Sequence, residues 1–447
     1  MLHALLEQLD DDQIQYCVLR DGEELASQDA QCEGNLEIDL LVAPEDWPRC
    51  RPFFEERGFV RLRVWGYAPH EFFVAYDADA DRWLKLDMVT QIVYRAPGGL
   101  AETALGPLLL KHRRQIGGVW VPQREHELLA LLLHCILDKN AFSEKRREQL
   151  QVLCHEICEV RQMDRLLAEY WPADIWQALA ERIEAEDWNY LLSQRQAVAD
   201  RFLARRKLRA WSSVQAQRVQ RKVGRWVGRL RSQSLSVALL APDGAGKSTL
   251  AAAVAESFYF PVHLAYMGLY AQNGRRSKRR VSVLGLLGRL ADQWRRYLVA
   301  RWHQMRGYLV VFDRYNYDVL ASSATRPGRL RRLRRTLLAY ACPPPDLICI
   351  LDAPGEVLFA RKGEHSAALL EQQRQGYLQL ARDFPQAVIV DATQDAAQVR
   401  RQILTLIWNY FAQRNGNSRL KRWRRSQPQQ NPLLTPAAPS PSSASPT

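Results

Sequence analysis

The stretch from Leu235 to Ala255 constrains the fold of this chain more than any other feature of its sequence. An apolar run, LSVALL, leads into the loop APDGAGKST, and an alanine-rich segment follows. The loop has the spacing GxxxxGK[ST] of phosphate-binding loops, except that Ala241 stands in place of the first glycine. Because such a loop needs a strand before it and a helix after it, the sequence predicts a layered α/β domain here.

Each residue type in this loop has a physical reason. Glycines allow successive backbone N–H groups to turn toward one anion, and the helix N-terminus adds its dipole. Lys247 supplies a positive charge for the β- and γ-phosphates, and the Ser248 hydroxyl is a ligand for Mg²⁺. We therefore predict ATP and Mg²⁺ as cofactors. The predicted nucleotide-binding residues are Asp243, Gly244, Ala245, Gly246, Lys247, Ser248 and Thr249.

Four further apolar runs follow the loop, at residues 261–267, 308–313, 346–352 and 387–391, with helical stretches between them. Continuous apolar strands that alternate with helices indicate a parallel sheet covered on both faces, here of five strands. Asp313, Asp352 and Asp391 each end such a run. Ligands bind at the carboxyl ends of parallel strands, so these carboxylates are expected near the loop. An aspartate there also commonly starts a turn, and for Asp391 both interpretations stay open.

Three motifs in this half of the chain resemble one family. The loop PDGAGKST, the strand end FDRY at 312–315 and the stretch LDAPGEVLFARKGE at 351–364 are similar to the thymidylate kinase family of P-loop nucleoside monophosphate kinases. The resemblance covers residues 234–415, with the motifs in the family's order. It implies a three-layer P-loop domain that transfers the γ-phosphoryl group of ATP to a phosphorylated acceptor.

The resemblance also implies roles for individual residues. It places Mg²⁺ at Ser248 and Asp352, and it makes Arg361, Lys362 and Arg374 part of a lid that closes over the phosphoryl group. The residues implied for catalysis are Lys247, Asp313, Arg314 and Arg361. The residues implied for the acceptor are Asp243, Arg314, Tyr315 and Arg374. Positive charge around the equatorial oxygens is what phosphoryl transfer requires.

One departure from the family pattern affects the acceptor. The family carries an Arg-Glu-Pro-Gly-like stretch after its second strand, whereas this chain has YMGLYAQNGRRSKRR from Tyr266. Further basic residues follow at 326–335. The acceptor is therefore left open among dTMP, a modified nucleotide, a sugar phosphate and a polyanionic glycan precursor.

The first 125 residues alternate short β-like runs with helical segments, which predicts an α+β domain. Glu37 and Asp39 fall on one face of the strand at 36–42, and Asp87 lies in the strand at 83–89. This arrangement resembles the metal triad of the DNA polymerase β-like nucleotidyltransferase superfamily, which implies a metal site at these three acids. The superfamily's Gly-Ser loop is incomplete, because Gly22 has no serine after it. An active site, a degenerate fold with a recognition role, and a solvated strand face all stay open.

The net charge of +13 is concentrated in one segment. Residues 201–233 contain eleven Lys or Arg and no Asp or Glu, with apolar residues at helical spacing. Such a basic amphipathic helix suits a peripheral membrane contact or an acidic partner, and it equally suits an interdomain helix. No nucleic-acid-binding motif accompanies the charge, so a nucleic-acid partner is not expected.

The expected organisation has four regions. A nucleotidyltransferase-like domain spans residues 1–125, a helical region ending in the basic helix spans 126–233, the kinase-like domain spans 234–415, and a basic, then Pro- and Ser-rich disordered tail spans 416–447. No apolar run approaches the roughly 18 residues of a membrane span, and the N-terminus is acidic, which predicts a cytoplasmic protein. The oligomeric state is left open. An ATP-binding regulatory or scaffold protein is the alternative to a kinase.

Overall fold

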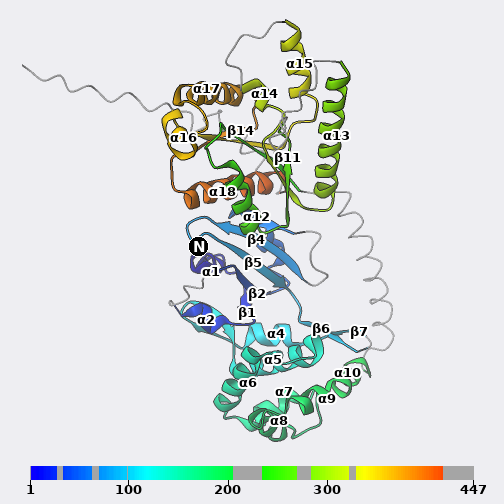
Figure 1. Cartoon of the computed structure of the whole chain (residues 1–447). Helices are drawn as coiled ribbons and strands as arrows, with labels where there is room; N and C mark the ends of the chain where they lie inside the picture. Colours follow the sequence, from blue (N-terminus) through cyan, green and yellow to red (C-terminus); the bar gives the residue numbers. More distant parts are fainter. Residues whose placement is uncertain are drawn as a thin grey trace, which may run out of the picture. The chain divides into compact units, whose positions relative to one another are not determined.

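The computed structural model describes residues 2–27, 34–62, 70–97, 99–204, 234–268, 283–321 and 329–415. The chain divides into two compact units, Met1–Arg231 and Ser232–Thr447 (Figure 1). The predicted basic helix lies outside the described residues from position 205 onward, and the predicted tail lies outside them entirely.

The second unit is built on a five-stranded parallel sheet with the strand order β11-β12-β10-β13-β14. The strands are β10 (Ser236–Leu240), β11 (Val262–Tyr266), β12 (Leu309–Asp313), β13 (Leu347–Asp352) and β14 (Ala387–Asp391). This confirms the predicted five-stranded parallel sheet in a mixed α/β unit. The strand that precedes the loop, β10, lies in the centre of the sheet.

Helices cover both faces of this sheet (Figure 1). They are α12 (Lys247–Ser257), α13 (Val283–Met305), α14 (Asp318–Ala321), α15 (Arg329–Ala339), α16 (Gly355–Lys362), α17 (Ala367–Asp383) and α18 (Ala396–Asn415). Helices α12 and α18 pack on each other, whereas α13 and α17 contribute to the core on the face of Ala238 and Leu240. Because both faces are covered, every residue of β10 is buried, which explains its unbroken apolar sequence.

The first unit contains a second five-stranded sheet with the order β1-β2-β5-β4-β3. Its strands are β1 (Tyr16–Val18), β2 (Leu36–Val42), β3 (Val60–Arg61), β4 (Glu71–Asp77) and β5 (Arg82–Val89). Pairing is antiparallel except between β2 and β5, which run parallel. Two hairpins complete the strands: β6 (Val93–Ala96) with β7 (Gly99–Glu102), and β8 (Arg113–Ile116) with β9 (Val119–Pro122).

Helices make up the rest of the first unit. They are α1 (Leu2–Asp11), α2 (Gly22–Ala26), α3 (Trp47–Glu56), α4 (Leu105–Lys111), α5 (Arg124–Leu133), the π-helix η1 (His134–Lys139), α6 (Glu144–Glu156), α7 (Val160–Leu167), α8 (Trp176–Glu184), α9 (Trp188–Ser193) and α10 (Arg195–Ala204).

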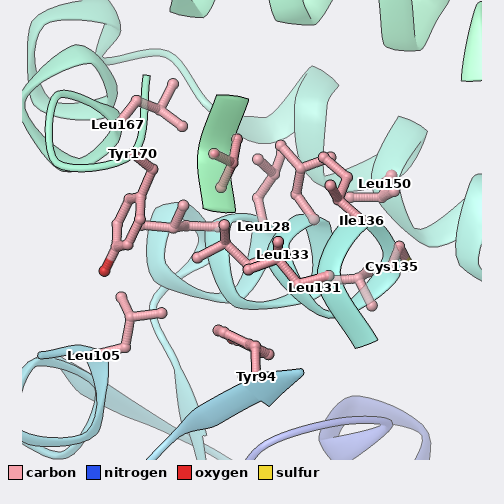
Figure 2. Packing of buried hydrophobic residues seen from close by; sticks show 14 of the residues in the cluster. Tyr94, Leu105, Leu128, Leu131, Leu133, Cys135, Ile136, Leu150, Leu167 and Tyr170 are labelled. Carbon is pink, nitrogen blue, oxygen red and sulfur yellow. The ribbon is translucent and has the colours of Figure 1, made fainter. Parts of the chain in front are cut away.

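The helical region after residue 125 shares a hydrophobic core with the strands before it. Figure 2 shows Leu128, Leu131 and Ile136 of α5 and η1 packed with Tyr94 of β6 and Leu105 of α4. The predicted boundary at residue 125 therefore lies inside one compact unit. Within the described ranges, no helix combines the length and the apolar composition that a membrane crossing requires.

A glycine in α17 sets how closely this helix approaches α14. A Cβ atom added at Gly376 would lie 2.5 Å from the backbone oxygen of Ala321, whereas a Cβ atom at Gly288 of α13 would meet nothing within 4 Å. We predict that Gly376→Ala lowers the free energy of unfolding by about 1–3 kcal/mol in urea denaturation of the full chain. Gly288→Ala is the control and should gain about 0.5–1 kcal/mol from helix propensity. Equal effects of the two substitutions would contradict the close contact.

Candidate functional site

The loop between β10 and α12 has the backbone conformation that its glycines allow. Gly244 and Gly246 have φ angles of 90° and 79°, in the left-handed region that residues with a Cβ rarely adopt. A Cβ atom at Gly244 would also lie 2.6 Å from the backbone oxygen of Leu358 in α16. The loop ends at the first residue of α12, where the first N–H groups of a helix have no partner inside it.

Lys247, the first residue of α12, is only 6% exposed. Its Nζ donates hydrogen bonds to the backbone oxygens of Ala241 (2.8 Å) and Pro242 (2.6 Å) and lies 3.8 Å from Asp243 Oδ1. Burial, helped by the nearby charge of Arg314, lowers the pKa of Lys247 to about 8. The loop thus holds a desolvated ammonium group directly after the central strand, where it attracts anions strongly.

Parallel strand pairing brings Ser248 and Asp313 together. Leu239 of β10 is in register with Asp313, the last residue of β12. The Oγ of Ser248 donates a hydrogen bond of 2.7 Å to Oδ2 of Asp313. A hydroxyl and a carboxylate are oxygen ligands of the kind that Mg²⁺ prefers. The two predicted residues therefore lie in direct contact.

Arg314 lies between two carboxylates. Its backbone has a φ of 71°, which is rare for a residue with a side chain. The guanidinium donates to Asp243 Oδ1 in the loop, and its Nη1 lies 3.5 Å from Asp318 Oδ2. Burial raises the pKa of Asp243, but the charges of Arg314 and Lys247 outweigh burial and hold that pKa below its ordinary value. Two carboxylates thus fix Arg314 at the edge of the loop between β10 and α12.

Two residues that the sequence analysis did not single out support Arg314. Asp318, at the start of α14, accepts a hydrogen bond of 3.0 Å from the Tyr377 hydroxyl of α17. Burial raises the pKa of Asp318 to about 6, although Arg314 and Lys247 both lower it. Asp318 follows the FDRY motif by three residues, and this spacing was the one available signal. The sequence offers no comparable signal for Tyr377, because a tyrosine in a helix usually belongs to the core.

Asp352 and Arg374 form a bidentate ion pair. Nε of Arg374 donates to Oδ1 (2.6 Å) and Nη2 donates to Oδ2 (3.0 Å), and Nη1 donates to Glu371 at 3.0 Å. The hydrogen bond to Asp352 raises the pKa of Arg374. Asp352 therefore binds the predicted lid arginine, and a metal ion at this carboxylate would require Arg374 to move. Asp313, in contrast, contacts the loop hydroxyl directly.

Three other predicted residues make their hydrogen bonds outside this cluster. Tyr315 is buried in the hydrophobic core, and its hydroxyl donates to the backbone oxygen of Pro343. Its side chain packs among core residues and is therefore not one of the charged groups around the loop. Arg361 donates to the backbone oxygen of Ala392 (2.9 Å), after β14. Asp391 accepts a hydrogen bond from the backbone N–H of Thr393, in the manner of a turn former.

The first unit gathers its three predicted acids. The parallel pairing of β2 and β5 places Asp39 directly beside Asp87. Ligand oxygens of Glu37, Asp39 and Asp87 all lie within 4.8 Å of one another. Burial raises the pKa of Asp39, and the negative charge of Asp87 adds to this rise, whereas Arg20 opposes it. The arrangement is a concentration of negative charge on the edge of a pocket.

Arginine, lysine and histidine side chains surround this acid cluster. Arg20 Nε lies 2.9 Å from Asp39 Oδ2, and His70 Nδ1 lies 2.8 Å from Asp87 Oδ1. Lys85 donates to Glu37. Arg20 also contacts His134 Nε2 at 2.9 Å. Arg20 and His134 line the pocket together with two of the acids, so groups of both signs face it.

No protein-family model matches this chain.

The contact between Arg314 and Asp318 makes a prediction for stability. Arg314→Ala removes the cation beside a largely buried carboxylate, which should lower the free energy of unfolding by about 3 kcal/mol at pH 7.5. The control is Arg295→Ala, whose exposed pair with Asp292 should cost at most about 1 kcal/mol. Urea denaturation of the full chain measures both. Equal losses would contradict a buried role for Asp318.

Proposed function

We propose that the second unit transfers the γ-phosphoryl group of ATP to a phosphorylated acceptor, in the manner of a thymidylate kinase-like P-loop enzyme. The observation that carries the proposal is the buried ammonium of Lys247, at the junction of a glycine loop with positive φ angles and a helix N-terminus. This arrangement favours binding of an anion of high charge. The Asp313 carboxylate at the end of β12 and the Ser248 hydroxyl would supply oxygen ligands for a divalent cation.

On the donor side, Lys247 has the decisive role. Its Nζ is held by two backbone oxygens, which are neutral acceptors, so phosphate oxygens compete with them favourably. Residues 244–248 offer backbone N–H groups at the start of α12 to the same anion. Ser248 and Asp313 would hold Mg²⁺, which neutralises the charge that develops between the β- and γ-phosphates.

On the acceptor side, Arg314 supplies the cation. Its guanidinium is held and oriented by the carboxylates of Asp243 and Asp318. An arginine fixed in this way binds a phosphate with two parallel N–H groups. The basic residues of the sequence at 274–280 and 326–335 favour an acceptor with more negative charge than dTMP, such as a polyanionic glycan precursor.

A phosphoryl-transfer screen tests this proposal. Full-length protein is incubated with γ-labelled ATP, Mg²⁺ and a panel of nucleoside monophosphates and sugar phosphates, and labelled products are separated. We predict turnover with one acceptor class, its abolition by Lys247→Ala, and a rise in the KM for the acceptor in Arg314→Ala. Lys111→Ala, at an exposed position at the end of α4, is the matched control and should leave turnover unchanged.

Other results would contradict a kinase. Slow ATP hydrolysis that no acceptor accelerates would indicate instead an ATP-binding regulatory or scaffold protein. Unchanged turnover in Lys247→Ala would show that the loop does not bind the nucleotide.

We also infer a second candidate function, in the first unit. The observation that favours it is the grouping of Glu37, Asp39 and Asp87 on the edge of a pocket that also contains Arg20 and His134. Like charges this close repel one another, and a divalent cation relieves the repulsion. The cationic groups beside it suit the phosphates of a nucleotide. This combination supports Mg²⁺-dependent nucleotide binding, as in nucleotidyltransferase-like domains.

Metal titration tests the first unit. We predict that Mn²⁺, used as a paramagnetic substitute for Mg²⁺, binds the full chain with a site that Asp39→Asn weakens at least about tenfold, since a buried ligand charge is lost. Glu45→Gln, at an exposed loop position after β2, is the control. Lys247→Ala keeps the metal site of the first unit intact, which separates it from the second. Equal binding by Asp39→Asn and Glu45→Gln would contradict the site.

A further inference from the structure

Helix α13 exposes an apolar stripe. Its members recur at intervals of seven, four, four and three residues, so they lie on one side of the helix: Leu287, Trp294, Leu298, Trp302 and Met305. Trp302 is 58% exposed. The opposite side of α13 carries buried residues such as Gln293 and Ala300, which face the sheet. The stripe is therefore not the side that folding of this unit buries.

Helix α15 exposes a second stripe. Leu330, Leu333 and Leu337 recur at helical spacing, and Tyr340 continues the series after the helix ends. Leu330 is 84% exposed and Leu333 is 59% exposed. Single exposed leucines are common on protein surfaces, but a contiguous set of this kind marks an interaction site. Burial of Leu338 and Ala339 anchors the helix in the unit.

The two stripes meet. Trp294 of α13 and Tyr340 line the same pocket, together with Phe384. Figure 1 shows α13 and α15 at the same end of the second unit. We call the exposed apolar residues of both helices the α13–α15 surface. It presents two tryptophans and one tyrosine, which are the side chains that favour a boundary between water and hydrocarbon.

The charge around this surface is positive. Helix α15 contains five arginines and no acidic residue, and its Arg329 and Arg332 are exposed. Arg295 on α13 is also exposed. A second copy of the chain docked here would bring arginines against arginines, which is unfavourable. An anionic surface has the complementary charge.

We propose that the α13–α15 surface docks the protein on an anionic lipid bilayer. The leucines and tryptophans would enter the interfacial layer, and the arginines would contact lipid phosphates and carboxylates. The apolar residues and the arginines are both needed. Burial of the apolar residues provides the free energy of partitioning into the bilayer, and the arginines provide the preference for anionic lipids. The proposal concerns the position of the second unit and does not depend on its catalytic activity.

Vesicle binding tests this proposal with the full chain. The partition coefficient is measured by co-sedimentation with vesicles of phosphatidylcholine alone and of phosphatidylcholine with phosphatidylglycerol, at two salt concentrations. We expect binding to the anionic vesicles only, weakened by salt. Leu330→Ser/Leu333→Ser should lower the partition coefficient at least about tenfold. Arg329→Gln/Arg332→Gln should also lower it about tenfold and reduce its salt dependence.

A matched control separates this surface from other exposed apolar residues. Val152→Ser/Val160→Ser replaces two valines of the first unit that are 55% and 50% exposed, and it should leave vesicle binding unchanged. Circular dichroism confirms that each variant is folded. Unchanged vesicle binding by Leu330→Ser/Leu333→Ser would overturn the proposal and point to residues 201–233. Loss of a dimer in analytical ultracentrifugation on the same substitution, without vesicle binding by the original chain, would overturn it in favour of self-association.

Discussion

The pairing of β10 with β12 on one side and with β13 on the other is the constraint on which the candidate site of the second unit depends. Parallel strands end at the same edge of a sheet, so this pairing brings the loop after β10 to the strand ends that carry Asp313 and Asp352. The fully buried apolar sequence of β10 maintains the position of the strand. Residues far apart in the sequence therefore form one charged cluster.

That cluster has internally balanced charge before any ligand enters. Lys247 is compensated by backbone oxygens and Asp243, and Arg314 by Asp243 and Asp318. A group held in this way is oriented in advance, which reduces the ordering that binding requires. Burial of the Lys247 ammonium has a free-energy cost, because it lowers the pKa of this group to about 8. Residues whose pKa values are perturbed in this way are common at functional sites.

The sequence predicted features that depend on local pattern. Unbroken apolar runs between helical stretches predicted the parallel sheet, and alternation in 36–42 placed Glu37 and Asp39 on one side of a strand. The sequence could not predict contacts that depend on the direction of a side chain after the end of a strand. Tyr315 points into the core, and Arg374 of α17 binds Asp352; both depend on how elements far apart in the sequence pack together. Helical periodicity also does not distinguish a buried apolar stripe from an exposed one. The sequence therefore could not predict the exposed apolar stripes of α13 and α15.

The contact between Gly244 and the backbone of Leu358 has a mechanical consequence. The atoms nearest to Gly244 on this side are backbone atoms of Leu358, so no side chain there can change rotamer to absorb a movement. A displacement of α16 must be transmitted to the loop, and a change of loop conformation must displace α16. Gly363 to His365 follow directly on α16, so this backbone contact couples their position to the conformation of the loop.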